Sequence, residues 1–286
     1  QRKISFSSHP FSSDCERQNA RRNEVMSAQI SPQAFVHEDA VLGNGVIVEA
    51  FAFIGPDVII GDRAWIGPNS SILSSATIGA DCKVFPGAVI GAEPQDLKFA
   101  NEPTKVVVGN RTVIRECVTI HRATVDRQKT VVGDDCLIMA YVHLAHDVHV
   151  GNNVIIANAV SVAGHVTIED WVIIEGMVGI QQFVRVGAHA FIAGGSMVRK
   201  NIPPYIKVAR EPLSYIGVNS IGLRRRGFLQ DRIQRIEDIY RTLYIQNANM
   251  SQALKVADVE FPACEEKDFV LDFIRESDKG IIRGPF

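Results

Sequence analysis

The stretch VEAFAFIGPDVIIGDRAWIGPNSSI, residues 48–72, places an aliphatic side chain at every sixth position. Neither the 3.6-residue period of an α-helix nor the two-residue period of a single strand fits this spacing. It predicts a β-solenoid of hexapeptide repeats, with three flat faces and about 18 residues per coil, and coils stacked about 4.8 Å apart. The same phase runs along most of the chain, at Val36, Leu42, Val48, Ile54, Ile60, Ile66, Ile72, Ile78, Val84, Ile90, Val108, Ile114 and Ile120, and then from Val132 to Val198.

Two polar stretches, 92–107 and 121–131, interrupt the repeat without changing its phase. Loops on a rigid scaffold commonly carry function, so we expect both to serve a site. After residue 204 the repeat ends, and apolar residues recur at helical spacing in 229–247, 251–260 and 265–276, the second with Ser251 as its N-cap. The sequence thus predicts an extension at 1–27, a parallel β-helix at 28–204 and a small C-terminal α-helical domain at 205–286.

Composition excludes several classes of protein. A net charge of −2 leaves no broad basic surface for nucleic acid, and no apolar run approaches the length of a membrane span. The five cysteines form no C-x-x-C pair, which argues against a disulfide framework or a thiolate zinc site and favours a reducing compartment. The serine-rich, basic start QRKISFSSHPFSS is typical of a transit peptide, so we expect an organelle matrix, mitochondrial before plastid, with bacterial cytoplasm as the alternative.

Four of the eight histidines lie within residues 143–165. In the hexapeptide register His143 and His149 face outward from strands, whereas His146 and His165 fall near corners outside the core. Asp147 precedes His165 by one coil, so the two should stack at one corner. A histidine beside an aspartate suits an oriented general base. A polar outer surface and a zinc site remain alternatives, because imidazoles also suit zinc.

Several non-repeat motifs resemble, in order, those of the UDP-N-acetylglucosamine O-acyltransferase family, the first enzymes of lipid A biosynthesis. These motifs are QDLK (95–98), NEPTKV (101–106), TIHR (119–122), HLAHD (143–147), AGH (163–165) and GVNSIGLRRRGF (217–228). The resemblance implies a left-handed parallel β-helix, a homotrimer with active sites between subunits, and transfer of an (R)-3-hydroxyacyl chain from acyl carrier protein to the sugar 3-hydroxyl of UDP-N-acetylglucosamine. It implies no metal and no bound cofactor, since the carrier's phosphopantetheine delivers the acyl group.

The resemblance also implies residue roles. His146 matches the general base, Asp147 the group that orients it, and the Gly164 N–H the donor to the oxyanion. Phe191 and Gly194 match the region at the far end of the acyl chain. Positions matching nucleotide-sugar contacts are Gln95, Asp96, Lys98, His121, His143, His165, Gln182, Asn219, Arg225 and Arg226.

Two positions depart from the family pattern. Gln181 stands where a histidine is usual, and Ile221 replaces a glutamate, so we expect altered affinity or substrate preference while the base is retained. Other functions stay open at this point: the N-acyltransferase of the same pathway, a zinc-dependent carbonic anhydrase, and a trimeric scaffold without catalysis.

Overall fold

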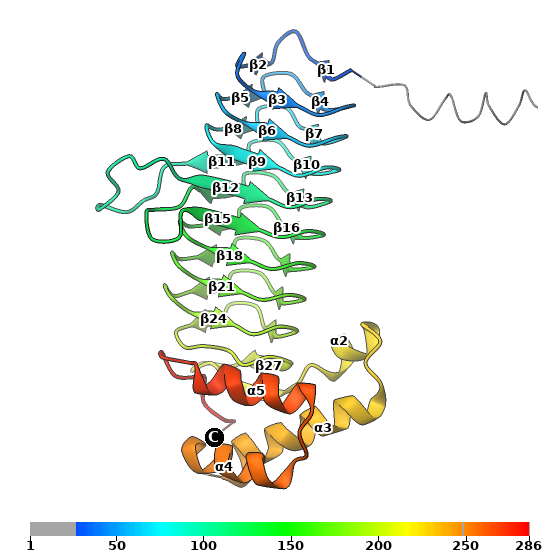
Figure 1. The fold of residues 1–286 in the computed structure, drawn as a ribbon, viewed down its shortest axis with the longest axis vertical. Coiled ribbons are helices and arrows are strands. Elements are labelled where there is room, and N and C mark those ends of the chain that lie inside the picture. Colours follow the sequence, from blue (N-terminus) through cyan, green and yellow to red (C-terminus); the bar gives the residue numbers. More distant parts are fainter. Residues whose placement is uncertain (1–26, 248, 286) are drawn as a thin grey trace, which may run out of the picture.

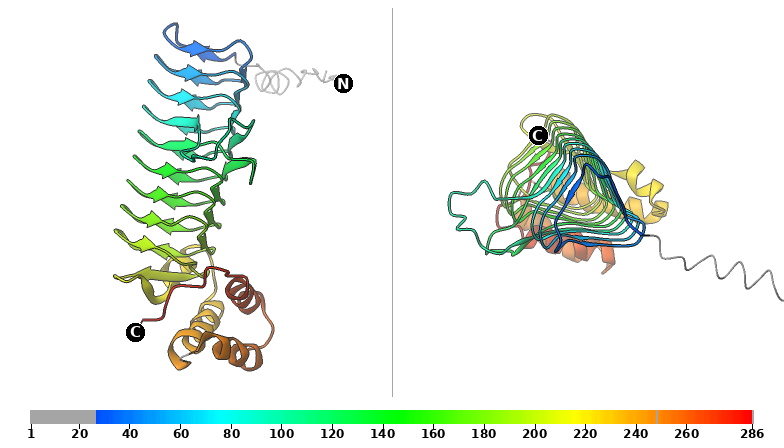
Figure 2. Two further views of the ribbon diagram at one scale, coloured as in Figure 1. Left: turned by 90° about the vertical axis from the view of Figure 1, so that its left-hand side faces the viewer. Right: turned by 90° about the horizontal axis from the view of Figure 1, so that it is seen from above.

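The computed structural model describes residues 27–247 and 249–285, so the expected extension lies outside the described part except for Ser27. The chain winds into a column of stacked coils, and helices gather at its C-terminal end (Figure 1). Viewed along the column, each coil is triangular (Figure 2). The repeat therefore forms the three-faced solenoid that its period predicts.

Each face of the column is one sheet of parallel strands, most of them two residues long. The first sheet contains β1 (Gln29–Ile30), β4 (Ile47–Val48), β7 (Trp65–Ile66), β10 (Lys83–Val84), β13 (Val113–Ile114), β16 (Leu137–Ile138), β19 (Ile155–Ile156), β22 (Ile173–Ile174) and β25 (Phe191–Ile192). The second contains β2 (Phe35–Val36), β5 (Phe53–Ile54), β8 (Ser71–Ile72), β11 (Val89–Ala92), β14 (Thr119–His121), β17 (His143–Leu144), β20 (Ser161–Val162), β23 (Gly179–Ile180) and β26 (Met197–Val198). The third contains β3 (Val41–Leu42), β6 (Ile59–Ile60), β9 (Ala76–Ile78), β12 (Lys105–Val108), β15 (Lys129–Val132), β18 (His149–Val150), β21 (Thr167–Ile168) and β24 (Arg185–Val186).

The core is the stack of aliphatic side chains at the sixth positions. Ile54, Ile66 and Ile72 are fully buried, and the residues four positions later, such as Ala64 and Ala76, fill the space beside them. Burying each isoleucine contributes about 1.5–3 kcal/mol relative to leaving it in water. The other residue of each short strand points outward, so every strand offers one side chain to the surface.

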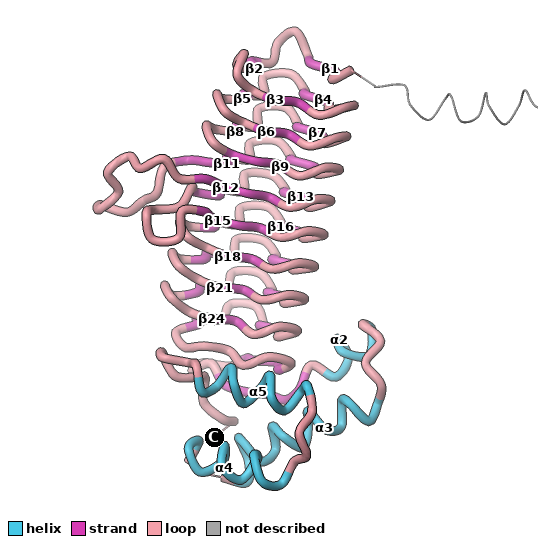
Figure 3. The backbone as a smooth tube through the Cα atoms, in the orientation of Figure 1, coloured by secondary structure: helices cyan, strands magenta, loops and turns pink. Residues whose placement is uncertain are grey.

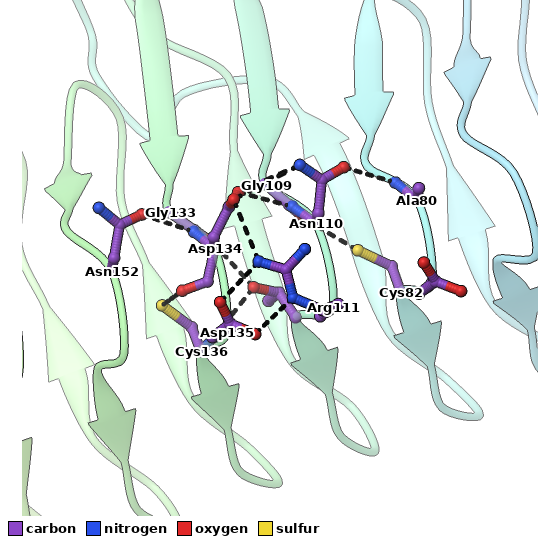
Figure 4. Close-up of polar contacts among 12 residues, drawn as sticks. Ala80, Cys82, Gly109, Asn110, Arg111, Gly133, Asp134, Asp135, Cys136 and Asn152 are labelled. Atoms are coloured by element: carbon purple, nitrogen blue, oxygen red, sulfur yellow. Dashed lines mark hydrogen bonds and ion pairs between the residues drawn. The ribbon is translucent and has the colours of Figure 1, made fainter.

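The corners after the third sheet carry a ladder of side-chain hydrogen bonds (Figure 4). Asn110 accepts from the Ala80 N–H at 2.9 Å, Asp134 from the Asn110 N–H at 2.8 Å, and Asn152 from the Asp134 N–H at 2.9 Å. These steps span 30, 24 and 18 residues, so the ladder restores the register across coils that contain the two loops. The buried thiols of Cys82 and Cys136 bond to carbonyls on the next coils.

The two interruptions are loops, as expected, but they are shorter than 92–107 and 121–131. Strands β11 and β12 extend into the first and leave 93–104, while β14 and β15 leave 122–128 of the second. Both loops leave the column at the corner between the second and third sheets (Figure 3). His146 and Asp147 occupy that same corner on the next coil, between β17 and β18. The loops therefore extend the wall of one corner.

The first sheet continues past residue 204, where the hexapeptide spacing ends. Strand β27 (Ile206–Ala209) pairs in parallel with β25, and β28 (Ser214–Val218) pairs antiparallel to β27. Helices α2 (Ser220–Arg225), α3 (Gln230–Arg241), α4 (Met250–Glu260) and α5 (Glu265–Arg275) follow, and the chain continues from α3 as the π-helical turn η1 (Thr242–Gln246).

Helix α4 begins one residue before the position that the sequence suggested. Asn249, rather than Ser251, is its N-cap, because the Asn249 side chain accepts from the Ser251 N–H at 2.9 Å. Every helix among the described residues is too short or too polar to span a bilayer.

Candidate active site

His146 and Asp147 form a buried pair at the corner between the second and third sheets. The His146 Nδ1 atom lies 2.8 Å from the Asp147 carboxylate. A carboxylate only accepts, so Nδ1 carries a proton, and in the neutral ring Nε2 is then the nitrogen with the lone pair. This tautomer is the one that a general base needs.

Asp147 is more deeply buried than the sequence suggested. Its side chain is completely inaccessible to solvent, since the loop 122–128 covers the corner. The carboxylate accepts from the Thr124 hydroxyl at 2.7 Å and from the Thr124 and Arg127 N–H groups at 3.1 Å. Burial alone would raise the pKa of Asp147, but the hydrogen bonds from His146, Thr124 and Arg127 together hold it below its usual value. Asp147 is therefore ionised and fixed in place.

Gly164 packs directly against the imidazole of His146. A Cβ atom at residue 164 would lie 2.6 Å from His146 Cε1 and 2.7 Å from Nε2. Among the described residues, no acceptor is hydrogen-bonded to the Gly164 N–H. The residue that carries this unengaged N–H thus packs against the ring that would take up a proton.

His165 lies one coil after Asp147 at the same corner, as the 18-residue spacing predicted. Its Nε2 atom is 3.7 Å from the Asp147 carboxylate, and its Nδ1 atom is 3.1 Å from Asp126. The ring stacks on Phe183 at a centroid distance of 4.6 Å. Burial lowers the pKa of His165, and the nearby carboxylates only partly oppose this effect. Sequence reasoning did not single out Asp126, although it stands in the second loop.

A cleft of about 600 Å³ opens over this pair. The first loop forms one wall and the corner residues of three successive coils form the other. The lining residues are Gln95, Asp96, Leu97, Lys98, His143, Ala145, His146, Ala163, Gly164 and Gln182. Asp96, Lys98 and Gln182 also line an adjoining hollow of about 310 Å³, and His165 lines only that hollow. Most of the residues expected to bind substrate are therefore brought together with His146.

His121 and His143 extend this surface along the second sheet. Their rings meet edge to face at 4.7 Å, and His143 Nδ1 lies 2.7 Å from the Thr119 hydroxyl. Burial, and then the neighbouring histidines, lower the pKa of His121 to about 4. Burial also lowers the pKa of His143. Both rings are neutral at pH 7, and the buried His121 Nδ1 has no hydrogen-bond partner among the described residues.

Five of the expected residues lie elsewhere in the chain. Asn219 caps α2, and Arg225 and Arg226 lie at the end of that helix, beside the corner between the third and first sheets. Phe191 points outward from the first sheet, and the Gly194 N–H bonds to Glu175 at 2.9 Å. None of the five lines the His146 cleft within the described chain.

The two departures from the family pattern lie on the surface. Gln181 follows β23 at an exposed position beside Gln182, and Ile221 is 59% exposed on α2. Neither contacts the His146–Asp147 pair, so the geometry of that pair does not depend on them.

The cluster of His146, Asp147 and His165 bears on the zinc alternative. His146, Asp147 and His165 offer atoms that all lie within 4.8 Å of one another. However, each oxygen of Asp147 already accepts at least two hydrogen bonds, including the one from His146 Nδ1. A carboxylate with its lone pairs used in this way is a poor metal ligand, because binding a cation would break those bonds.

A hexapeptide β-helix with an imidazole–carboxylate pair in a corner cleft is typical of a transferase of the hexapeptide-repeat class. In agreement, a family model for bacterial transferase hexapeptides of six repeats matches residues 57–92 and 129–164. A second family model, described as UDP N-acetylglucosamine O-acyltransferase, domain 2, matches residues 201–282.

Individual relatives agree with these matches. An acyl-[acyl-carrier-protein]--UDP-N-acetylglucosamine O-acyltransferase from Paraburkholderia phymatum is 41% identical over 196 residues, which cover 66% of this chain and 74% of the relative. The crystal structure of a UDP-N-acetylglucosamine acyltransferase from Bacteroides fragilis superposes with a TM-score of 0.87 at 44% identity, covering 89% of this chain and all of that one. The Arabidopsis UDP-N-acetylglucosamine acyltransferase gives a TM-score of 0.78 at 32% identity, with 89% and 100% coverage.

The chain therefore belongs to the UDP-N-acetylglucosamine O-acyltransferase family. The expected left-handed parallel β-helix followed by a C-terminal helical region is confirmed.

Proposed function

We propose that this protein transfers an (R)-3-hydroxyacyl chain from acyl carrier protein to the 3-hydroxyl of UDP-N-acetylglucosamine, the first step of lipid A biosynthesis. The observation that carries the proposal is the His146–Asp147 pair at 2.8 Å, facing a cleft lined by Gln95, Asp96 and Lys98. The names of the relatives, which describe this acyltransferase, support it.

The chemistry follows from the geometry of the pair. A sugar hydroxyl is a weak nucleophile at neutral pH, so His146 Nε2 removes its proton as the oxygen attacks the thioester carbonyl. The buried Asp147 carboxylate stabilises the imidazolium that forms. The Gly164 N–H donates to the oxyanion of the tetrahedral intermediate. When the carbon–sulfur bond breaks, the imidazolium returns its proton to the departing phosphopantetheine thiolate, which leaves as the thiol on acyl carrier protein. This step uses no resident cofactor.

We further propose a homotrimer whose sites lie between neighbouring subunits. This assembly is supported by a separation within one chain: the His146 cleft lies apart from Asn219, Arg225 and Arg226. A neighbouring subunit can bring its own copies of these three residues to the cleft. The first sheet offers an apolar surface for the contact, because it presents a row of half-buried outward side chains: Val113, Leu137, Ile155, Ile173 and Phe191. Light scattering tests the stoichiometry.

The remaining residues are assigned by contact and charge. Lys98, Arg225 and Arg226 suit the diphosphate, while His121, His143, His165 and Gln182 suit the rest of the nucleotide sugar. Phe191 and Gly194, on the apolar first sheet and at its edge, suit the far end of the acyl chain. A mitochondrial matrix location is proposed only on the composition of residues 1–13; cell fractionation distinguishes it from a plastid or a bacterial cytoplasm.

Acyl transfer to UDP-N-acetylglucosamine from 3-hydroxyacyl carrier proteins of several chain lengths tests the proposal. Turnover should fall by about 10²- to 10⁴-fold in His146→Ala. His149→Ala is the matched control, because His149 faces outward from the third sheet and contacts the Lys129 carbonyl; it should keep wild-type turnover. Absence of turnover by the folded wild type would contradict the proposal. Acylation of an amino-sugar acceptor alone would favour the N-acyltransferase, zinc-dependent CO₂ hydration the carbonic anhydrase, and neither activity a scaffold.

A further inference from the structure

Arg226 is a half-buried cation without a carboxylate partner. Among the described residues no Asp or Glu oxygen lies within ion-pair distance of its guanidinium, and burial lowers its pKa. Two other partly buried arginines are paired, Arg185 with Glu169 at 2.7 Å and Arg232 with Glu265 at 3.1 Å. Burying a guanidinium without a counter-charge costs free energy, and a bound anion would offset that cost through charge-assisted hydrogen bonds.

Arg226 is instead held by neutral groups. Its Nη1 atom lies 3.1 Å from His189 Nδ1, and its guanidinium carbon lies 5.4 Å from the centre of the Trp171 ring. A guanidinium only donates, so the His189 Nδ1 atom accepts and the imidazole is neutral. Burial, and then the charge of Arg226, lower the pKa of His189 to about 4, against a smaller opposing effect of Asp170.

The His189 ring is fixed by aromatic neighbours. It stacks between the rings of Trp171 and Tyr205. The centroid distance is 6.3 Å and the interplanar angle 4° for Trp171, and 5.5 Å and 16° for Tyr205. The Phe228 and His189 rings form a T-shaped pair with their centroids 5.2 Å apart. This stack continues along the corner of the column, so the imidazole has little freedom to turn away from Arg226.

The backbone of His189 contacts the N-terminal end of helix α2, opposite the end at which Arg226 lies. The Asn219 side chain, which caps α2, donates to the His189 carbonyl at 2.9 Å, and Arg226 is the C-cap residue of α2. One residue of the β-helix therefore fixes both ends of the segment that carries the family's Asn219, Arg225 and Arg226 positions.

We propose that His189 is a positioning residue for the nucleotide-sugar site: it orients the Arg226 guanidinium through a neutral acceptor and leaves its remaining N–H donors and full charge for the diphosphate. A carboxylate at this position would orient the arginine equally well, but it would neutralise the charge that binds the anion. This inference rests on the proposed function, yet binding of the diphosphate can be measured without turnover.

Two variants separate the orientation of Arg226 from the packing of the His189 ring. His189→Phe keeps the aromatic stack and removes the acceptor, and Phe183 shows that a phenylalanine accepts the same left-handed backbone, with φ of 67° against 62° at His189. His189→Asn provides an amide oxygen near the place of Nδ1, and asparagine tolerates this conformation well.

Titration calorimetry with UDP and with uridine supplies the readout. We expect His189→Phe to lower the affinity for UDP by about 10- to 100-fold, the loss typical of a hydrogen bond to a charged group. The affinity for uridine should stay within about twofold of the wild-type value. His189→Asn should recover most of the affinity, and in turnover the loss should appear in KM rather than kcat. Unchanged UDP binding by His189→Phe, or equal losses for UDP and uridine, would overturn the proposal. If the wild type binds UDP but transfers no acyl chain, the proposed function fails while this inference stands.

Discussion

The Gly164 Cα hydrogen lies against the His146 imidazole so closely that a methyl group there would be 2.6 Å from Cε1. Real side chains essentially never approach this near, so one of the two residues would have to move. The imidazole cannot move freely, because Asp147 holds its Nδ1 atom at 2.8 Å. A glycine on one coil therefore determines where the proposed base stands on the preceding coil.

Gly164→Ala should therefore lower kcat by about 100-fold, the loss that follows when a reacting group is displaced by about 1 Å. Alanine keeps the backbone N–H, so the loss reports displacement of the imidazole and not removal of the oxyanion donor. The control is the same substitution in a His146→Ala background, where it should cost no further activity. Wild-type turnover by Gly164→Ala would show that the imidazole can shift without consequence.

Asp147→Asn should keep the fold and lower kcat by about 10²- to 10⁴-fold, because the amide can donate to Nδ1 and so favours the wrong tautomer of His146. Calorimetry should show affinity for UDP-N-acetylglucosamine within about twofold of wild type. Asp126→Asn is the matched carboxylate control, since Asp126 contacts His165 and not His146. If the two variants lose activity equally, the role of Asp147 is not specific to the base.

The period of six was sufficient to predict the coils and the directions of their side chains. The position of a residue in the coil follows from its number alone, because each step of six residues moves to the equivalent position on the next face. A spacing of 18 residues, three steps of six, places His165 beside Asp147, as the structure shows. The same spacing would place His189 beside Trp171, and these two rings stack. Relationships that follow from whole coils are thus readable in the sequence.

Contacts made by segments without a period could not be read in this way. The burial of Asp147 depends on Thr124 and Arg127 in an irregular loop, whose backbone path no spacing encodes. The hydrogen bond between His189 and Arg226 joins residues 37 apart across the end of the repeat. The helix start at Asn249 rather than Ser251 is a choice between two good N-caps, and packing of the helical region decides it.

Asp134→Ala should lower the free energy of unfolding by about 1 kcal/mol, because the partly buried Asn110 N–H loses its acceptor at 2.8 Å. Asp135→Asn is the matched control one residue away: it removes the carboxylate that pairs with an exposed Arg111 (Figure 4), and asparagine tolerates the left-handed backbone there, with φ of 56°. Exposed ion pairs contribute little, so its loss should be smaller. Urea unfolding followed by circular dichroism measures both. Equal losses would show that the hydrogen bond from Asn110 to Asp134 contributes no more to stability than an exposed ion pair.

The stability of the protein should fall as the pH is lowered from about 6.5 to about 4. The pKa of His121 and that of His189 are both lowered from 6.5 to about 4, so in this interval the unfolded chain binds protons that the native chain does not. Each such histidine should reduce the free energy of unfolding by about 1.4 kcal/mol per pH unit. The pKa of Asp147 is lowered from 3.8, so its contribution to the free energy of unfolding is lost only as the pH falls below about that value. Urea unfolding at pH 7, 6 and 5 measures the slope, and His121→Asn should make it shallower by one histidine's share. A slope unchanged in that variant would mean that His121 is protonated in the native state.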